Sequence, residues 1–129
     1  MTKEEKMLLI KDLSARLPYA VTVEHTSGFR GTLHDITVHH MYDDNDNVYD
    51  AICYTDFFGD EDSIYIEYFK PYLFPLSSMT EEQKEDMIKS SCGIGSDKNV
   101  FDWYNKNHFD YRGLILMDLA IDATGLNIY

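Results

Sequence analysis

Basic residues are scarce in this sequence, which holds 11 Lys and Arg against 23 Asp and Glu and has a formal net charge of −12. The shortage is greatest between Glu24 and Glu67, where eleven acidic residues against the single base Arg30 leave a net charge of −10. Binding to nucleic-acid phosphates or to an anionic membrane needs clustered Lys and Arg. The charge therefore disfavours nucleic acid and membranes as partners, and it favours another protein with a basic surface, or a cation.

Cysteines and long apolar runs are also few. The two cysteines, Cys53 and Cys92, form no CxxC pair, so a disulfide scaffold is not indicated. No run approaches the roughly 18 apolar residues of a membrane span. The N-terminal segment MTKEEKMLLIKDLSARL is too charged for a signal peptide. These absences predict a cytoplasmic protein with reduced thiols.

Motifs of nucleophilic and phosphate chemistry are missing as well. The sequence contains no GxSxG, Walker or HExxH pattern, and Gly93-Ile94-Gly95 is too short for a phosphate loop. Cys92 is expected near the C-terminus of a helix, where a thiolate is disfavoured. The sequence therefore predicts no catalytic residue and no cofactor.

Apolar and aromatic residues, in contrast, are plentiful. Hydrophobic residues make up 44% of the 129 positions, and ten tyrosines and seven phenylalanines are present. This length suits one domain, which we expect to cover residues 1–129. Aromatic residues in short alternating segments favour strands.

The first half of the chain predicts one helix and a sheet. Thr2 and Glu5 form a capping-box pattern and Pro18 ends the helix, on which Arg16 is expected to face solvent. Alternating segments predict strands at residues 20–25, 29–41, 48–55 and 63–69, and a fifth, edge strand at 71–75. In the second strand the apolar positions change from odd to even numbers, which indicates a bulge near His34-Asp35.

The second half predicts helices. Thr80 and Gln83 form another capping box for a helix to about Ser90, and Asp97 begins a helix through Trp103. A short helix at 109–115, a loop and a terminal strand complete the chain. The predicted class is α+β: an N-terminal helix, a bent antiparallel sheet of four to five strands and C-terminal helices. Such a meander can also curl into a small SH3-like barrel.

The segments KPYLFPLSSMTEEQ (70–83) and NKNHFDYRGLI (105–115), with MTKEE and KDLSARLPY near the N-terminus, carry a resemblance. They resemble segments of a family of small uncharacterised proteins from anaerobic gut bacteria, their prophages and their phages. The resemblance thins between residues 21 and 69, where Gly31, Leu33 and Asp35 loosely resemble the second strand of Sm-like proteins. The resemblance to the phage and prophage family implies only a context, an accessory gene of a mobile element, because that family has no assigned activity.

Two predicted acidic loops form the first candidate binding surface. Their carboxylates are Asp43, Asp44, Asp46, Asp60, Glu61 and Asp62. Such loops can bind a basic partner, imitate the phosphates of DNA, or hold calcium, although the EF-hand order of ligands is missing. The simplest interpretation is a solvated acidic surface that keeps the protein soluble.

Imidazole and carboxylate groups near the predicted bend form the second candidate. His34, His39, His40 and Asp43 are residue types that ligate a divalent transition metal. Alternation along a strand would place His34 and His40 on one face, unless the bulge changes it. No spacing matches a known zinc motif, so ordinary strand and loop residues are the simpler interpretation.

His108, Tyr111 and Arg112 form the third candidate, because aromatic residues and Arg are favoured at binding hot spots. We expect these three at the surface, and Trp103 and Tyr104 in the core. The leading functional prediction is a non-enzymatic acidic interaction protein that inhibits or adapts a host protein. The alternatives are a metal-binding module or metal-dependent enzyme that uses the His34–Asp46 cluster, and a small-molecule-binding barrel.

Overall fold

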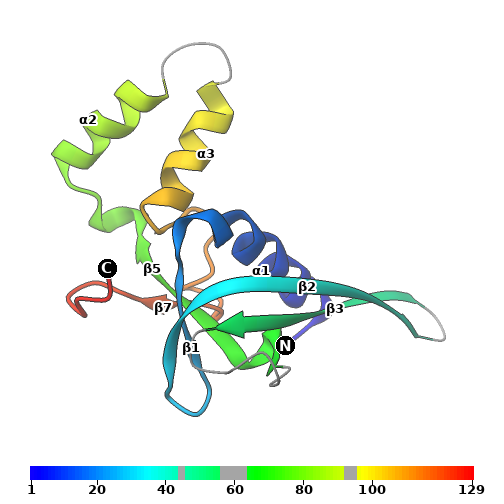
Figure 1. Cartoon of the computed structure of the whole chain (residues 1–129). Coiled ribbons are helices and arrows are strands. Elements are labelled where there is room, and N and C mark those ends of the chain that lie inside the picture. The colour runs from blue at the N-terminus through cyan, green and yellow to red at the C-terminus, as the bar shows by residue number, and fades with distance from the viewer. Residues whose placement is uncertain (44–45, 56–63, 92–95) are drawn as a thin grey trace.

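The computed structural model of the chain describes residues 1–43, 46–55, 64–91 and 96–129, and for 39–43, 46–50, 64, 96 and 97 it describes the backbone alone. It confirms the α+β class, with an N-terminal helix, a mixed sheet and C-terminal helices (Figure 1). Within these ranges no helix is long and apolar enough to cross a membrane.

Helix α1 (Lys3–Arg16) begins and ends where the sequence predicts. The Thr2 hydroxyl accepts a hydrogen bond from the Glu5 amide, and the Glu5 carboxylate accepts one from the Thr2 amide, both at 3.1 Å. This capping box satisfies two amides that have no partner inside the helix. Pro18 lies in the 3-10 turn η1 (Leu17–Tyr19), which ends the helix.

The sheet has the strand order β4-β3-β2-β1-β5-β6, with β7 also paired to β5. Its strands are β1 (Thr22–His25), β2 (Arg30–Asp43), β3 (Asp46–Thr55), β4 (Ile64–Tyr65), β5 (Phe69–Pro75), β6 (Phe109–Asp110) and β7 (Ile121–Asp122). The pairs from β4 to β5 are antiparallel, whereas β6 and β7 pair with β5 in parallel. The described strands therefore form an open mixed sheet, not a closed barrel.

The predicted bulge is present in β2. Leu33 pairs with Thr55 and Asp35 pairs with Tyr54, so His34 is an extra residue. Leu33 is buried and Ile36 packs against the core, although their positions differ in parity. Because of the extra residue, the even-numbered Ile36 faces the core after the bend, as the odd-numbered Leu33 does before it. This explains why the apolar positions of the sequence change from odd to even numbers.

The single strand predicted at residues 63–69 is wrong. After β4 the chain forms a 3-10 turn, η2 (Ile66–Tyr68), before β5 begins at Phe69. Ile66 is fully buried whereas Tyr68 is 45% exposed, so these two residues do not share a face. The turn is needed because β4 pairs with β3 while β5 pairs with β1, on the other side of the sheet.

Strand β5 is interior, and the prediction of an edge strand is wrong. It pairs with β1 on one side and with β6 and β7 on the other.

The helix predicted at 109–115 is also absent, because Phe109 and Asp110 form β6. The Asp110 carboxylate accepts hydrogen bonds from the amides of Leu114 and Ile115, both at 2.9 Å, which closes a turn there. The predicted terminal strand exists as β7.

Helices α2 (Glu81–Ser90) and α3 (Ser96–Lys106) form a pair that projects from the sheet (Figure 1). Thr80 and Gln83 form the predicted capping box of α2. α2 has no buried residue, and the Trp103 indole donates a 2.9 Å hydrogen bond to Asp86 across the pair. α3 is anchored because Trp103 stacks on Phe109 with 5.5 Å between the ring centroids.

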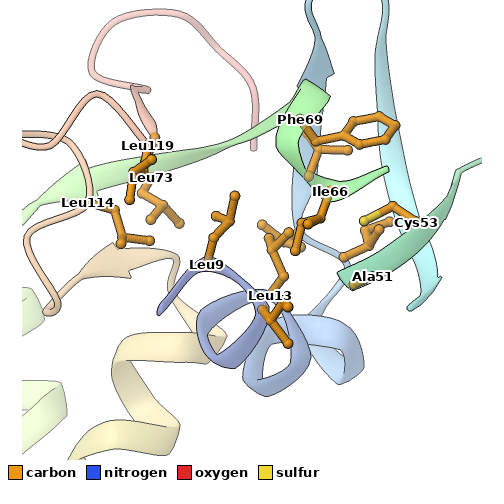
Figure 2. Close-up of a cluster of buried hydrophobic side chains, with 14 residues drawn as sticks. Leu9, Leu13, Ala51, Cys53, Ile66, Phe69, Leu73, Leu114 and Leu119 are labelled. Carbon is orange, nitrogen blue, oxygen red and sulfur yellow. The ribbon is translucent and has the colours of Figure 1, made fainter. Parts of the chain in front are cut away.

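The main core lies between α1 and the sheet (Figure 2). Leu9 and Leu13 of α1 point toward buried side chains from β3, η2 and β5 and from the C-terminal segment. These partners are Ala51, Cys53, Ile66, Phe69, Leu73, Leu114 and Leu119. The C-terminal segment is thus part of the same core as the N-terminal helix.

Candidate functional site

The predicted acidic loops are placed only in part. Asp43 and Asp46 pair with each other at the ends of β2 and β3, so the strands extend further than predicted. Asp44, Asp60, Glu61 and Asp62 lie outside the described residues, and the side chains of Asp43 and Asp46 do as well. The prediction that these six carboxylates form one surface therefore stays a prediction.

Strands β2 and β3 form a long arm beyond the rest of the sheet (Figure 1). Their pairing continues from Asp35 opposite Tyr54 to Asp43 opposite Asp46. The neighbouring strands stop early: β1 pairs with β2 only at residues 30–32, and β4 pairs with β3 only at 52 and 53. Among the described strands, none therefore pairs with the outer edges of the arm at residues 38–43 of β2 and 46–50 of β3.

The predicted metal cluster is not assembled by the described side chains. His34 and Asp35 are exposed, and the Asp35 carboxylate accepts a 2.8 Å hydrogen bond from the Ile36 amide. The register shift at His34 breaks the alternation on which the shared face of His34 and His40 depended. No three His, Cys, Asp or Glu residues among the described ones are placed to hold a metal ion. The side chains of His39, His40 and Asp43 lie outside that description, so the metal alternative stays a prediction.

A buried ion-pair network lies where α1 meets the C-terminal segment. Asp12 and Arg16 are both fully buried, and they form hydrogen bonds of 2.8 and 3.1 Å through Nε and Nη2 of the guanidinium. Arg112 donates a further 2.8 Å hydrogen bond from Nη1 to Asp12. Arg16 also donates to the Phe109 carbonyl at 2.7 Å. One carboxylate thus holds two guanidinium groups in place.

Tyr111 joins this network to an aromatic cluster. The guanidinium carbons of Arg112 and Arg16 lie 4.5 and 5.5 Å from the centroid of the Tyr111 ring. The Tyr111 hydroxyl donates a 3.0 Å hydrogen bond to the side chain of Asn105, and its ring lies against Phe101 with the centroids 5.2 Å apart. The structure therefore brings together two of the three residues predicted as the third candidate.

A cavity of about 390 Å³ opens beside these side chains, between α1, α3 and the segment after β6. We call it the Arg112 pocket. It is lined by Lys11, Ala15, Phe101, Asn105, Tyr111 and Arg112. The sequence predicted neither the roles of Lys11 and Asn105 nor the burial of Arg16. The spacing of Asp12 and Arg16 by four residues, on the same face as Leu9 and Leu13, is the signal that could have found the network.

His108 is buried, although the sequence predicts it at the surface. It has a positive φ of 63°, and its ring stacks on Tyr129 with 3.6 Å between the centroids. The Tyr129 hydroxyl donates a 2.7 Å hydrogen bond to the Tyr72 carbonyl and accepts one of 3.0 Å from the Thr22 amide. Burial raises the pKa of Tyr129 to about 12. His108 thus belongs to the packing of the C-terminal segment and not to the Arg112 pocket.

Burial and the nearby charge of Arg16 lower the pKa of His108 to about 4, from an ordinary value of 6.5. Between pH 6.5 and 4 the unfolded chain therefore binds a proton that the folded chain does not. This contribution to stability is complete above pH 6.5 and is lost as the pH falls through that window. We expect the loss to reach about 2–3 kcal/mol at pH 4.

Urea unfolding of the wild type and of His108→Asn between pH 7.5 and 4 measures this loss. Asn is the replacement because it tolerates a positive φ. Both proteins contain the same carboxylates and differ only at residue 108, so the stability advantage of the wild type should shrink toward pH 4. Parallel pH dependences would show that His108 contributes nothing to acid sensitivity.

The fold and site define a small α+β domain with an open mixed sheet, a projecting two-stranded arm and a cationic, aromatic pocket. Comparisons with protein-family models, with curated proteins and with solved structures find no match.

Proposed function

We propose that this protein is a non-enzymatic interaction protein that binds a basic partner protein through the β2–β3 arm. The observation that carries the proposal is the arm itself, in which two strands continue without a third beside them in the described part of the sheet. An isolated two-stranded hairpin is marginally stable in water, and its open edges can pair with another chain. A partner that binds the arm would supply the missing contacts.

The charge of this region supports a basic partner. The stretch from Glu24 to Glu67, which contains the whole arm, has eleven acidic residues against one base. Complementary charge speeds association and selects among partners. The resemblance of both ends of the chain to proteins of phages and prophages suggests a host protein as the partner, which this protein would inhibit or adapt.

Reversal of charge at the tip of the arm tests the proposal. We expect Asp43→Lys, Asp44→Lys and Asp46→Lys together to lower recovery of a stoichiometric partner from cell lysate by about ten-fold or more. The wild-type complex should dissociate at moderate salt, because salt screens exposed charges. Quantitative mass spectrometry of the captured proteins measures both effects.

A matched control is available on α2. Glu81→Lys, Glu82→Lys and Glu85→Lys together change the net charge by the same amount, at exposed positions on a helix with no buried residue. This variant should retain the partner. Full retention by the arm variant, or equal loss in the control, would contradict a role for the arm.

A further inference from the structure

The Arg112 pocket is a concentration of positive charge in an acidic protein. Arg16 and Arg112 both pair with the carboxylate of Asp12, and Lys11 lines the pocket, so these four residues carry two positive charges in excess in a chain of formal net charge −12. We propose that this pocket binds a small monoanionic ligand that carries a carboxylate next to an aromatic ring. The proposal concerns a different part of the molecule from the arm and does not depend on its function.

The Arg112 guanidinium supplies the site for the carboxylate. Its Nη1 donates to Asp12, whereas Nε and Nη2 have no hydrogen-bond acceptor in the described part of the chain. These two atoms form the edge of a guanidinium that binds a carboxylate through two parallel hydrogen bonds. The edge is held ready because Asp12 is fully buried and is itself fixed by Arg16. A group that is already in position loses little entropy on binding.

The aromatic side chains supply the site for the ring. Phe101 and Tyr111 lie against each other at the wall of the pocket, and Phe101 is 49% exposed. Aromatic rings favour offset or edge contacts with a further ring. The Asn105 oxygen accepts from Tyr111, so its amide nitrogen, which has no acceptor among the described residues, can donate to the ligand. A volume of about 390 Å³ is sufficient for a small ligand.

The charge of the whole protein restricts the class of anion. A formal charge of −12 repels anions at long range, and the repulsion grows with the charge of the ligand. A monoanion loses the least binding free energy to this repulsion. The local excess of two positive charges is sufficient to bind it. A carboxylate is therefore favoured over a phosphate or a nucleotide.

The test is a titration of the protein with benzoate. The NMR chemical shifts of the Asn105 side-chain amide and of the Arg112 Nε–H report the binding. We expect saturable shifts with a dissociation constant on the order of 1 mM, as befits so small a ligand. Benzamide lacks the charge and acetate lacks the ring, so each should bind about ten-fold more weakly. Binding of inorganic phosphate or acetate as tight as that of benzoate would overturn the proposed class of ligand.

Three variants separate the site from general electrostatics. Arg112→Lys keeps a cation beside Asp12 but removes the planar edge, and Lys11→Gln removes an exposed charge at the pocket. Each should weaken benzoate binding by about five- to ten-fold in a folded protein. Lys98→Gln removes an exposed charge of α3 outside the pocket and should leave binding unchanged. No saturable shift in the wild type, or equal weakening by Lys98→Gln, would overturn the proposal.

Discussion

Replacement of Asp12 by Ala should lower the free energy of unfolding by about 3–5 kcal/mol, because it leaves the charge of Arg16 buried without a counter-charge. Arg16 is fully buried, and its Nη1 already has no hydrogen-bond partner among the residues that the structure describes. After the substitution only the Phe109 carbonyl would still accept from it. Urea unfolding at pH 7, followed by circular dichroism, measures the change.

Two further variants show whether the buried charge is the cause. Asp118→Asn removes an ion pair with Lys70 of similar length, 2.9 Å, but the Asp118 side chain is 90% exposed, and Asn tolerates the positive φ of 59° at this position. It should cost less than about 0.5 kcal/mol. The double variant Asp12→Leu, Arg16→Met should recover most of the loss, because it removes both charges and fills the space. A loss below about 1 kcal/mol in Asp12→Ala would contradict this account.

Replacement of Phe109 by Ala should cost about 3–5 kcal/mol, the usual cost of removing a buried phenylalanine ring. Phe109 is 1% exposed, and it stacks on Trp103 of α3 and contacts Phe74 of β5. Its loss would leave a cavity between the sheet and the helix pair. Urea unfolding measures the cost, and the fluorescence of Trp103, the one tryptophan of the chain, should shift to the red as water reaches it.

Phe101→Ala is the matched control, because the same ring is removed from the same part of the molecule. Phe101 is 49% exposed, so we expect a cost below about 1 kcal/mol and unchanged tryptophan emission. Equal costs for the two variants would show that the contact between Phe109 and Trp103 does not anchor α3.

The features predicted correctly are those that depend on neighbouring residues. A capping box joins residues three apart, so Thr2 with Glu5 and Thr80 with Gln83 located the starts of α1 and α2. The bulge was predictable for a similar reason, because an extra residue at His34 changes the parity of every apolar position after it. Local patterns of this kind are present in the sequence whatever the rest of the chain does.

The errors arose where a strand changes partner. Ile64 to Phe69 alternate as a strand would, yet η2 divides them because β4 and β5 pair with different strands. Phe109 and Asp110 lie in β6 instead of a helix because β5 offers a free side for parallel pairing. Such pairings join segments far apart in the chain, and a pattern of nearby residues does not contain them.

By itself the sequence determined the α+β class, the capped helices, the bent sheet and the acidic middle of the chain, because each follows from composition or from residues a few positions apart. Only the tertiary structure decided the Arg112 pocket. The ion pair between Asp12 and Arg112 joins residues 100 positions apart, and it forms because α1 and the C-terminal segment share one core. Arg16 illustrates the difference: its charge favours solvent, and Asp12, one turn away on the same helix, supplies a counter-charge, but only the fold brings the Phe109 carbonyl and a buried position to it.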